Sequence, residues 1–227
     1  MDHTIIENLE TINTEIATVF AYYFLEPRAV NIIAVSKNHT AEHIMPLLKA
    51  GHRVFGENKV MEAIEKWTPL KALYPDIELH LIGALQSNKV KKALTIFDVI
   101  QTIDRPSLID ELVKYPDIIK DKKFFIQVNT GHEDQKSGVT LTDFASLLAY
   151  AKDKLLPISG LMCIPPIHDN AVHHFTVLQS LVRQNGARQN GGLKMSAGMS
   201  ADFDKAIIAG TDYIRIGTAL FGKREAV

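Results

Sequence analysis

Residues 31–58, NIIAVSKNHTAEHIMPLLKAGHRVFGEN, carry the pattern that decides the fold. The run Asn31–Val35 is rich in β-branched residues and predicts a short strand. Ala41–Ala50 then predicts a helix that Gly51 ends, and His52–Phe55 predicts the next strand. Two strands joined by a helix in this way pair in parallel through a right-handed crossover.

The same unit recurs along the whole chain. Runs that predict strands are Asn31–Val35, His52–Phe55, Glu78–Ile82, Asp98–Ile103, Lys123–Val128, Ile158–Ile164, Leu193–Ser196 and Tyr213–Ile216. Between them, apolar residues at i, i+3 and i+4 predict amphipathic helices. Eight strands alternating with helices predict an α/β fold, a single (β/α)8 barrel of the TIM type that occupies residues 1–227 as one domain. A doubly wound open sheet is the alternative.

An additional helix is expected before the first strand. Apolar residues from Ile5 to Phe20 recur at helical spacing, and Pro27 ends the pattern. The segment Ala219–Val227 after the last strand is too short for a full covering helix. We therefore expect the N-terminal helix to cover that part of the barrel.

Composition excludes several classes of protein. Among 227 residues, 25 basic and 26 acidic side chains give a net charge of −1, which argues against a nucleic-acid partner. No apolar stretch reaches the roughly 20 residues that cross a membrane, so no membrane partner is expected. Cys163 is the single cysteine, which excludes an internal disulfide and a multi-thiolate metal site. A reducing cytoplasm is the predicted compartment, and no metal site is predicted.

Polar residues gather where the predicted strands end, which is where active sites of such barrels form. Lys37 follows the run Ile32–Val35, so we expect its side chain in the barrel mouth with apolar walls around its stem. Burial favours a neutral amine, which can form a Schiff base with an aldehyde. A lysine that merely starts a surface loop is the alternative. Gly56, Glu57 and Asn58 could likewise cap the next helix, or Asn58 could bond a ligand hydroxyl.

An anion site is predicted at the ends of strands seven and eight. Ser200 precedes a helix expected to begin just after it, and Gly217 and Thr218 follow the last strand. Ordinary helix capping and a turn are the alternatives. Arg215 lies inside the last strand and is expected to point into the barrel, where its charge needs an acceptor. A ring nitrogen, a carboxylate or a phosphate would serve.

The chain resembles the pyridoxal-phosphate-binding, or pyridoxal phosphate homeostasis, protein family, whose barrel is like the N-terminal domain of alanine racemase. Seven blocks in order carry the resemblance: Ala34–Lys37, Phe55–Asn58, His80–Lys89, Val128–Gly131 with Gln135–Lys136, Gly160–Pro166, Ser196–Ser200 and Arg215–Gly222. It implies a type III pyridoxal phosphate fold. It also implies that Lys37 holds pyridoxal 5'-phosphate (PLP) as an internal aldimine, that Ser200, Gly217 and Thr218 bind the phosphate, that Arg215 faces the pyridine nitrogen, and that Asn58 lies near the ring.

The resemblance implies a non-catalytic protein with no catalytic residue, which buffers or delivers PLP in vitamin B6 and amino-acid homeostasis. Its partners would be PLP and, transiently, apo forms of PLP-dependent enzymes, and the barrel would be a monomer or weak homodimer. Few residues follow the last predicted strand, so we expect no second domain of the kind that helps similar racemases supply an opposing acid or base.

Two enzymatic alternatives remain open at this point: a slow PLP-dependent racemase or lyase with Lys37 as base, and a Schiff-base aldolase acting on a phosphorylated sugar. A second, transient phosphate-binding place at Lys89 and Lys136 is a further hypothesis, beside the reading that these lysines are solvated surface.

Overall fold

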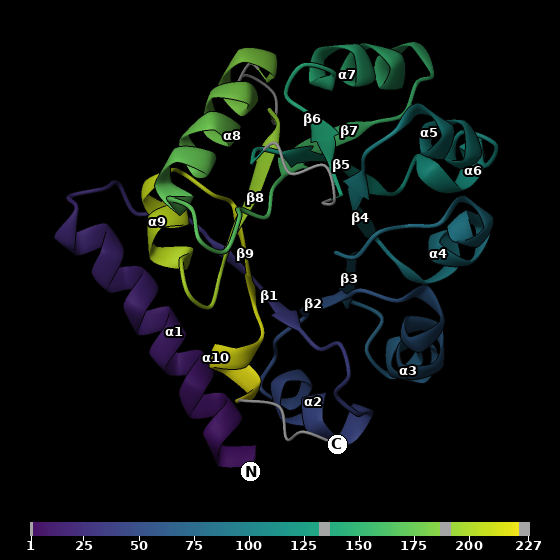
Figure 1. Cartoon of the computed structure of the whole chain (residues 1–227). Helices are drawn as coiled ribbons and strands as arrows, with labels where there is room; N and C mark the ends of the chain where they lie inside the picture. The colour runs from purple at the N-terminus through teal and green to yellow at the C-terminus, as the bar shows by residue number, and fades with distance from the viewer. Residues whose placement is uncertain (1, 132–136, 187–191, 223–227) are drawn as a thin grey trace.

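The computed structural model describes residues 2–131, 137–186 and 192–222. Eight parallel strands close into a barrel: β1 (Asn31–Val35), β2 (Val54–Glu57), β3 (Glu78–Leu81), β4 (Val99–Ile103), β5 (Lys123–Asn129), β7 (Ile158–Met162), β8 (Lys194–Met199) and β9 (Tyr213–Ile216). A β4–β5 pairing and a β1–β9 pairing complete the ring, which Figure 1 shows nearly along its axis. A two-residue strand, β6 (Val139–Thr140), pairs with the end of β5. The predicted barrel is confirmed, and the open sheet is wrong.

Helices form a ring outside the strands (Figure 1). They are α2 (Ala41–Lys49), α3 (Val60–Leu73), α4 (Val90–Ile96), α5 (Pro106–Leu112), α6 (Pro116–Ile119), α7 (Phe144–Asp153), α8 (Ala171–Asn185), α9 (Phe203–Ile208) and α10 (Thr218–Phe221), with a 3₁₀ turn, η1 (Ser87–Lys89), before α4. Their apolar faces bury residues such as Trp67, Leu108 and Phe175 against the strands. This burial removes apolar surface from water and supplies the main driving force for closing the barrel.

The N-terminal helix α1 (Asp2–Tyr22) lies where the short α10 leaves the barrel uncovered. It packs against α9, α10 and α2, and Figure 1 shows it running along the outside of α9 and α10. Ile5, Ile12, Ile16 and Phe20 are buried at helical spacing on one side of it. The predicted covering helix is therefore confirmed.

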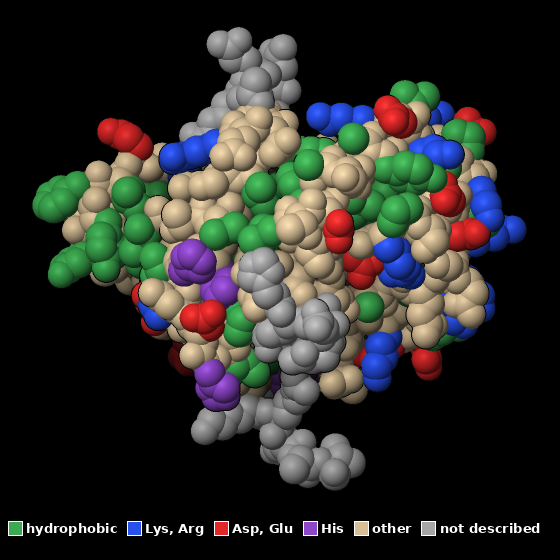
Figure 2. Space-filling model, turned by 45° about the horizontal axis from the view of Figure 1, so that its top comes forward, with side chains coloured by type: hydrophobic (Ala, Val, Ile, Leu, Met, Phe, Trp, Pro, Cys, Tyr) green, Lys and Arg blue, Asp and Glu red, His purple; other side chains and the backbone are tan. Residues whose placement is uncertain are grey.

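The barrel surface mixes both signs of charge. On the face shown in Figure 2, Lys and Arg side chains are interspersed with Asp and Glu, while hydrophobic side chains gather at the edge over the end of α1. Tyr22, Tyr23 and Phe24 at that end are exposed. Among the described residues, no helix is both long enough and apolar enough to cross a membrane.

Candidate functional site

A cavity of about 320 Å³ lies where β1, β8 and β9 run out into their loops. Its size falls in the range of small-molecule sites, about 300–1,000 Å³. The six residues predicted to bind a cofactor all line it: Lys37, Asn58, Ser200, Arg215, Gly217 and Thr218. Its other walls include Val35, Ile82 and Ile164, so the cavity is apolar with a few convergent polar groups.

Lys37 stands in the loop after β1 and is half-buried. Among the described residues, its side-chain amine has no hydrogen-bond or ion-pair partner. Val35 and Ile82 line the same cavity and supply the apolar surroundings predicted for the lysine stem. The amine is thus held in a partly desolvated cavity and is available to a ligand.

A buried ion pair fixes the backbone on both sides of Lys37. Lys66 Nζ donates to the carbonyl oxygens of Ser36 and His39, each at 2.8 Å, and lies 2.8 Å from Glu57 Oε1. Glu57 is fully buried, and its Oε1 also accepts from Ser36 Oγ at 2.7 Å and from Trp67 Nε1 at 3.0 Å. The loop that carries Lys37 is therefore tied to β2 and α3 by the Glu57 carboxylate. A second carboxylate, Glu62 on α3, accepts from the backbone N–H of Asn38 at 2.7 Å.

This role of Glu57 and Lys66 is not predicted by the sequence. Helix capping, the alternative expected for residues 56–58, is wrong: α3 begins at Val60, and its N-cap, Lys59, makes no side-chain capping bond. A glutamate at a strand end, followed by a helix that contains a tryptophan, was the sequence feature that could have indicated this role. The groups that the carboxylate contacts depend on how α3 packs against the barrel.

Arg215 is buried on β9, and its donors meet neutral acceptors. Nη1 donates to Ser196 Oγ at 2.8 Å, and Nη2 donates to the carbonyl oxygen of Cys163 at 2.7 Å. No ion pair to Arg215 occurs among the described residues, so the carboxylate acceptor considered from the sequence is not supplied there. Burial lowers the pKa of the guanidinium, because desolvation disfavours its charged form.

The loops after β8 and β9 meet at Ser200. Its Oγ accepts from the backbone N–H of Ala219, in the first turn of α10, at 3.2 Å. The helix expected just after Ser200 begins later, at Phe203. The reason is a turn in which Asp202 Oδ1 accepts from Met199 N at 2.6 Å and Asp202 N donates to Met199 O at 3.0 Å. Ser200 therefore joins two loops and does not cap α9.

Gly198 shapes the turn before Ser200, and its replacement by alanine is expected to be costly. Its φ is +93°, and an added Cβ would lie 2.6 Å from Ala206 Cβ and 2.9 Å from Phe203 Cα. Gly198→Ala should lose about 2–5 kcal/mol of unfolding free energy, from left-handed strain plus overpacking. Gly51→Ala, with φ +89° but open space around it, should lose about 1–2 kcal/mol. Urea unfolding measures both losses, and equal losses for the two variants would contradict the crowding expected at Gly198.

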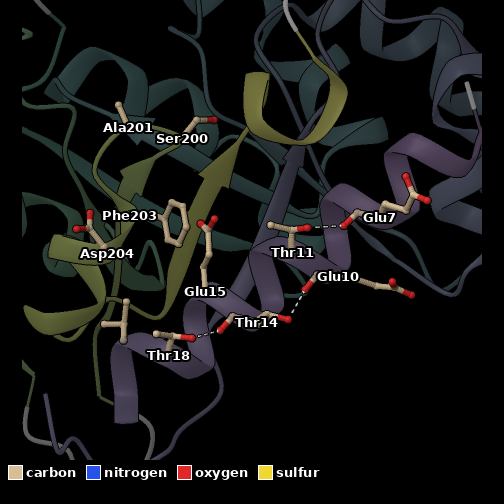
Figure 3. Close-up of a pocket in the computed structure, with 11 residues that line it drawn as sticks. Glu7, Glu10, Thr11, Thr14, Glu15, Thr18, Ser200, Ala201, Phe203 and Asp204 are labelled. Carbon is tan, nitrogen blue, oxygen red and sulfur yellow. Dashed lines mark hydrogen bonds between the residues drawn. The ribbon is translucent and has the colours of Figure 1, made fainter. Parts of the chain in front are cut away.

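A larger cavity, of about 730 Å³, lies on the other side of the Ser200 loop, against α1 (Figure 3). Its charged lining is acidic: Glu7, Glu10, Glu15 and Asp204. The charged groups of the smaller cavity, Lys37 and Arg215, are basic. An anion such as a phosphate is therefore favoured in the smaller cavity and repelled from the larger one.

Comparison with known proteins identifies the family. The model of the alanine racemase N-terminal domain matches residues 10–225. The pyridoxal phosphate homeostasis protein of Vibrio alginolyticus is 36% identical over 228 residues, which cover 96% of this chain and 97% of that protein. The protein of the same name from Escherichia coli K12 is 34% identical and covers 97% of both chains. The chain belongs to the pyridoxal phosphate homeostasis protein family.

Solved structures agree with this family. PipY of Synechococcus elongatus PCC7942, solved without PLP and with PLP bound, is 34% identical, and the match covers 96% of this chain and 100% of PipY with TM-scores of 0.81 and 0.79. Alanine racemase from Acinetobacter baumannii is 18% identical with a TM-score of 0.70, and the match covers 62% of that enzyme. The racemase likeness shows the fold alone.

In this family member, the cavity residues fit PLP. Asn58 Oδ1 is buried and has no hydrogen-bond partner among the described residues, so it can accept from a ligand hydroxyl. Gly83 lets Asn58 sit there, because a Cβ at Gly83 would lie 2.4 Å from the Asn58 carbonyl oxygen. The Lys37 amine, the unpaired Asn58 acceptor and the hydroxyls of Ser200 and Thr218 match an aldehyde, a hydroxyl and a phosphate.

Other groups considered from the sequence do not join this site. Cys163 is fully buried, and desolvation raises its pKa to about 12, so it is a packed thiol and not a nucleophile. Among the described residues, no group of three or more His, Cys, Asp or Glu could hold a metal. Lys89 lines a separate groove beside Gln86, and Lys136 lies outside the described residues. A second phosphate site at these lysines stays a hypothesis.

Proposed function

We propose that this protein binds PLP through a Schiff base with Lys37 and buffers or delivers it without catalysing a reaction. The observation that carries the proposal is the unpaired Lys37 amine in a cavity lined by all six predicted residues. Relatives named pyridoxal phosphate homeostasis protein and the PLP-bound structure of PipY support it. We propose residues 1–227 as one PLP-binding domain, acting in the cytoplasm as a monomer or weak homodimer.

Each cavity residue has a defined part in this proposal. Lys37 would hold the aldehyde carbon through its amine, with the carbonyl oxygen leaving as water, and Arg215 would donate to the pyridine nitrogen. The hydroxyls of Ser200 and Thr218, with the backbone at Gly217, bind the phosphate, and Asn58 accepts from the ring hydroxyl. When bound, PLP would supply an electron sink, but a guanidinium facing its ring nitrogen keeps that nitrogen unprotonated and weakens the sink.

The placement of acid and base groups favours a carrier over a racemase. Racemisation requires proton transfer on both faces of the substrate carbon. Among the described residues that line the cavity, the side chains with an amine or imidazole are Lys37 and His39, which share the loop after β1. No carboxyl, imidazole or amine from another element lines the cavity among the described residues, so a slow racemase or lyase is the less favoured function.

A transfer assay tests the proposed function. PLP-loaded protein is mixed with a purified apo aminotransferase in the presence of a trap for free PLP. Recovery of aminotransferase activity, compared with the same amount of free PLP under the trap, measures direct delivery. We expect recovery with the protein and no conversion of L-alanine to D-alanine by the loaded protein in a chiral assay. Steady formation of D-alanine would contradict the non-catalytic proposal.

The phosphate-binding role of the last two loops makes a separate prediction. Ser200→Ala and Thr218→Val should each weaken PLP binding about 5- to 50-fold, because each removes a hydrogen bond to a charged group. Binding of pyridoxal, which lacks the phosphate, should stay within about 2-fold of wild type. Fluorescence titration measures both ligands. Thr176→Val, on the exposed side of α8, is the matched control. Equal losses for both ligands would contradict the phosphate assignment.

A further inference from the structure

A chain of hydrogen bonds crosses the interior of the barrel and ends at Arg215. From Arg215 Nη1 it runs to Ser196 Oγ (2.8 Å), and from Ser196 Oγ to Gln101 Oε1 (2.7 Å). Gln101 Nε2 lies 2.8 Å from His80 Nδ1, and His80 Nε2 lies 2.8 Å from Glu78 Oε1. These five side chains come from four strands, β9, β8, β4 and β3.

Every link has one permitted direction. Glu78 is a carboxylate that only accepts, because its bond to His80 is the main cause that lowers its pKa to about 2. His80 must then carry its proton on Nε2 and accept at Nδ1, and burial lowers its pKa and keeps the ring neutral. The Gln101 amide nitrogen therefore donates to His80, its oxygen accepts from Ser196, and Ser196 accepts from Arg215.

The chain joins a positive charge at the cavity to a negative charge at the opposite end of the strands. His80, Gln101 and Ser196 are 0% exposed, so breaking any link would leave buried donors and acceptors unpaired. Of the five residues, Arg215 alone lines the cavity. Glu78 begins β3 and also pairs with Lys123 Nζ at 2.6 Å on the outside. Aligned hydrogen bonds of this kind polarise one another in a low-dielectric interior.

We infer that Ser196, Gln101, His80 and Glu78 are positioning residues that fix the guanidinium plane of Arg215 for a ring nitrogen bound in the cavity. The inference rests on the proposed function. Two of the five Arg215 N–H donors are held by Ser196 and by the Cys163 carbonyl oxygen, so the guanidinium plane has one orientation before a ligand binds. Sub-ångström placement of such a donor decides its strength toward an aromatic nitrogen.

A ligand pair separates this role from a general effect on cavity shape. The probes are PLP and 1-deaza-PLP, in which a C–H replaces the ring nitrogen. Ser196→Ala should weaken PLP about 10-fold and change binding of 1-deaza-PLP by less than about 2-fold, because the second ligand has no nitrogen for Arg215 to meet. Ser196→Thr, which keeps the hydroxyl, should restore the preference for PLP. Urea unfolding of each variant confirms that it is folded.

The far end of the chain provides a second variant with a matched control. Glu78→Gln keeps an acceptor for His80 but removes the charge, and should weaken PLP about 2- to 5-fold with no change for 1-deaza-PLP. Asp76→Asn removes a carboxylate two residues away that pairs with Arg53 and takes no part in these hydrogen bonds. It should change the affinity for neither ligand. Equal weakening of both ligands by Ser196→Ala would overturn this inference alone. A wild-type protein that binds neither ligand would overturn the proposed function and this inference with it.

Discussion

Lys37→Ala is expected to abolish the visible absorption band that forms when the wild-type protein takes up PLP. The band requires a Schiff base, and Lys37 carries the unpaired amine that lines the predicted cavity. With the covalent bond gone, the phosphate contacts and Arg215 remain, so PLP should bind about 100-fold or more weakly, which corresponds to about 2.7 kcal/mol. Absorbance titration measures both effects.

The control is another lysine on the neighbouring helix. Lys49, in the last turn of α2, is exposed and lies outside the cavity, so Lys49→Ala should form the band with wild-type affinity. Unchanged band formation by Lys37→Ala would move the reactive amine elsewhere and contradict the proposed role of this lysine.

Glu57→Ala is expected to destabilise the fold by about 3–5 kcal/mol, because it removes the nearer carboxylate of a buried ammonium and leaves Glu62 Oε1, at 3.6 Å, as the remaining one. Lys66 has only 8% of its side chain exposed, and Trp67 Nε1 and Ser36 Oγ would lose their acceptor in the same step. The Lys37 loop, which Lys66 holds by two carbonyl oxygens, should also loosen and bind PLP less tightly.

Urea unfolding measures the loss, with Glu65→Ala, on the helix α3 that carries Lys66, as the control. Glu65 is exposed and should change the free energy of unfolding by less than about 0.5 kcal/mol. If Glu57→Ala cost as little as Glu65→Ala, the ion pair would not be what holds the Lys37 loop.

The strands and the cavity could be predicted from sequence because both depend on local patterns and on a topological rule. Each β-branched run marks a strand, parallel barrels bring all strand ends to one face, and polar residues after those ends must therefore converge. The observed strand bounds differ from the predicted ones where a side chain bonds to a nearby backbone group. The strand expected at His52–Phe55 is Val54–Glu57, with Val54 paired to Glu78 and His52 Nε2 bonded to the Val54 carbonyl oxygen.

The supporting contacts could not be predicted, because they join residues far apart in the chain. Ser196 and Gln101 are 95 positions apart, and nothing local to either predicts that they meet. A polar residue inside an apolar strand, such as Gln101 in Val99–Ile103, indicates an interior partner but leaves that partner unnamed. The late start of α9 has a similar cause, since the Asp202 carboxylate stabilises a turn that competes with the helix.

Borohydride reduction followed by peptide mapping tests the central claim most directly. Wild-type protein is mixed with PLP, reduced and digested, and the modified peptide is sequenced by mass spectrometry. We expect one pyridoxyl phosphate group per chain, fixed on Lys37. A group fixed on any other lysine, or none at all, would contradict the account.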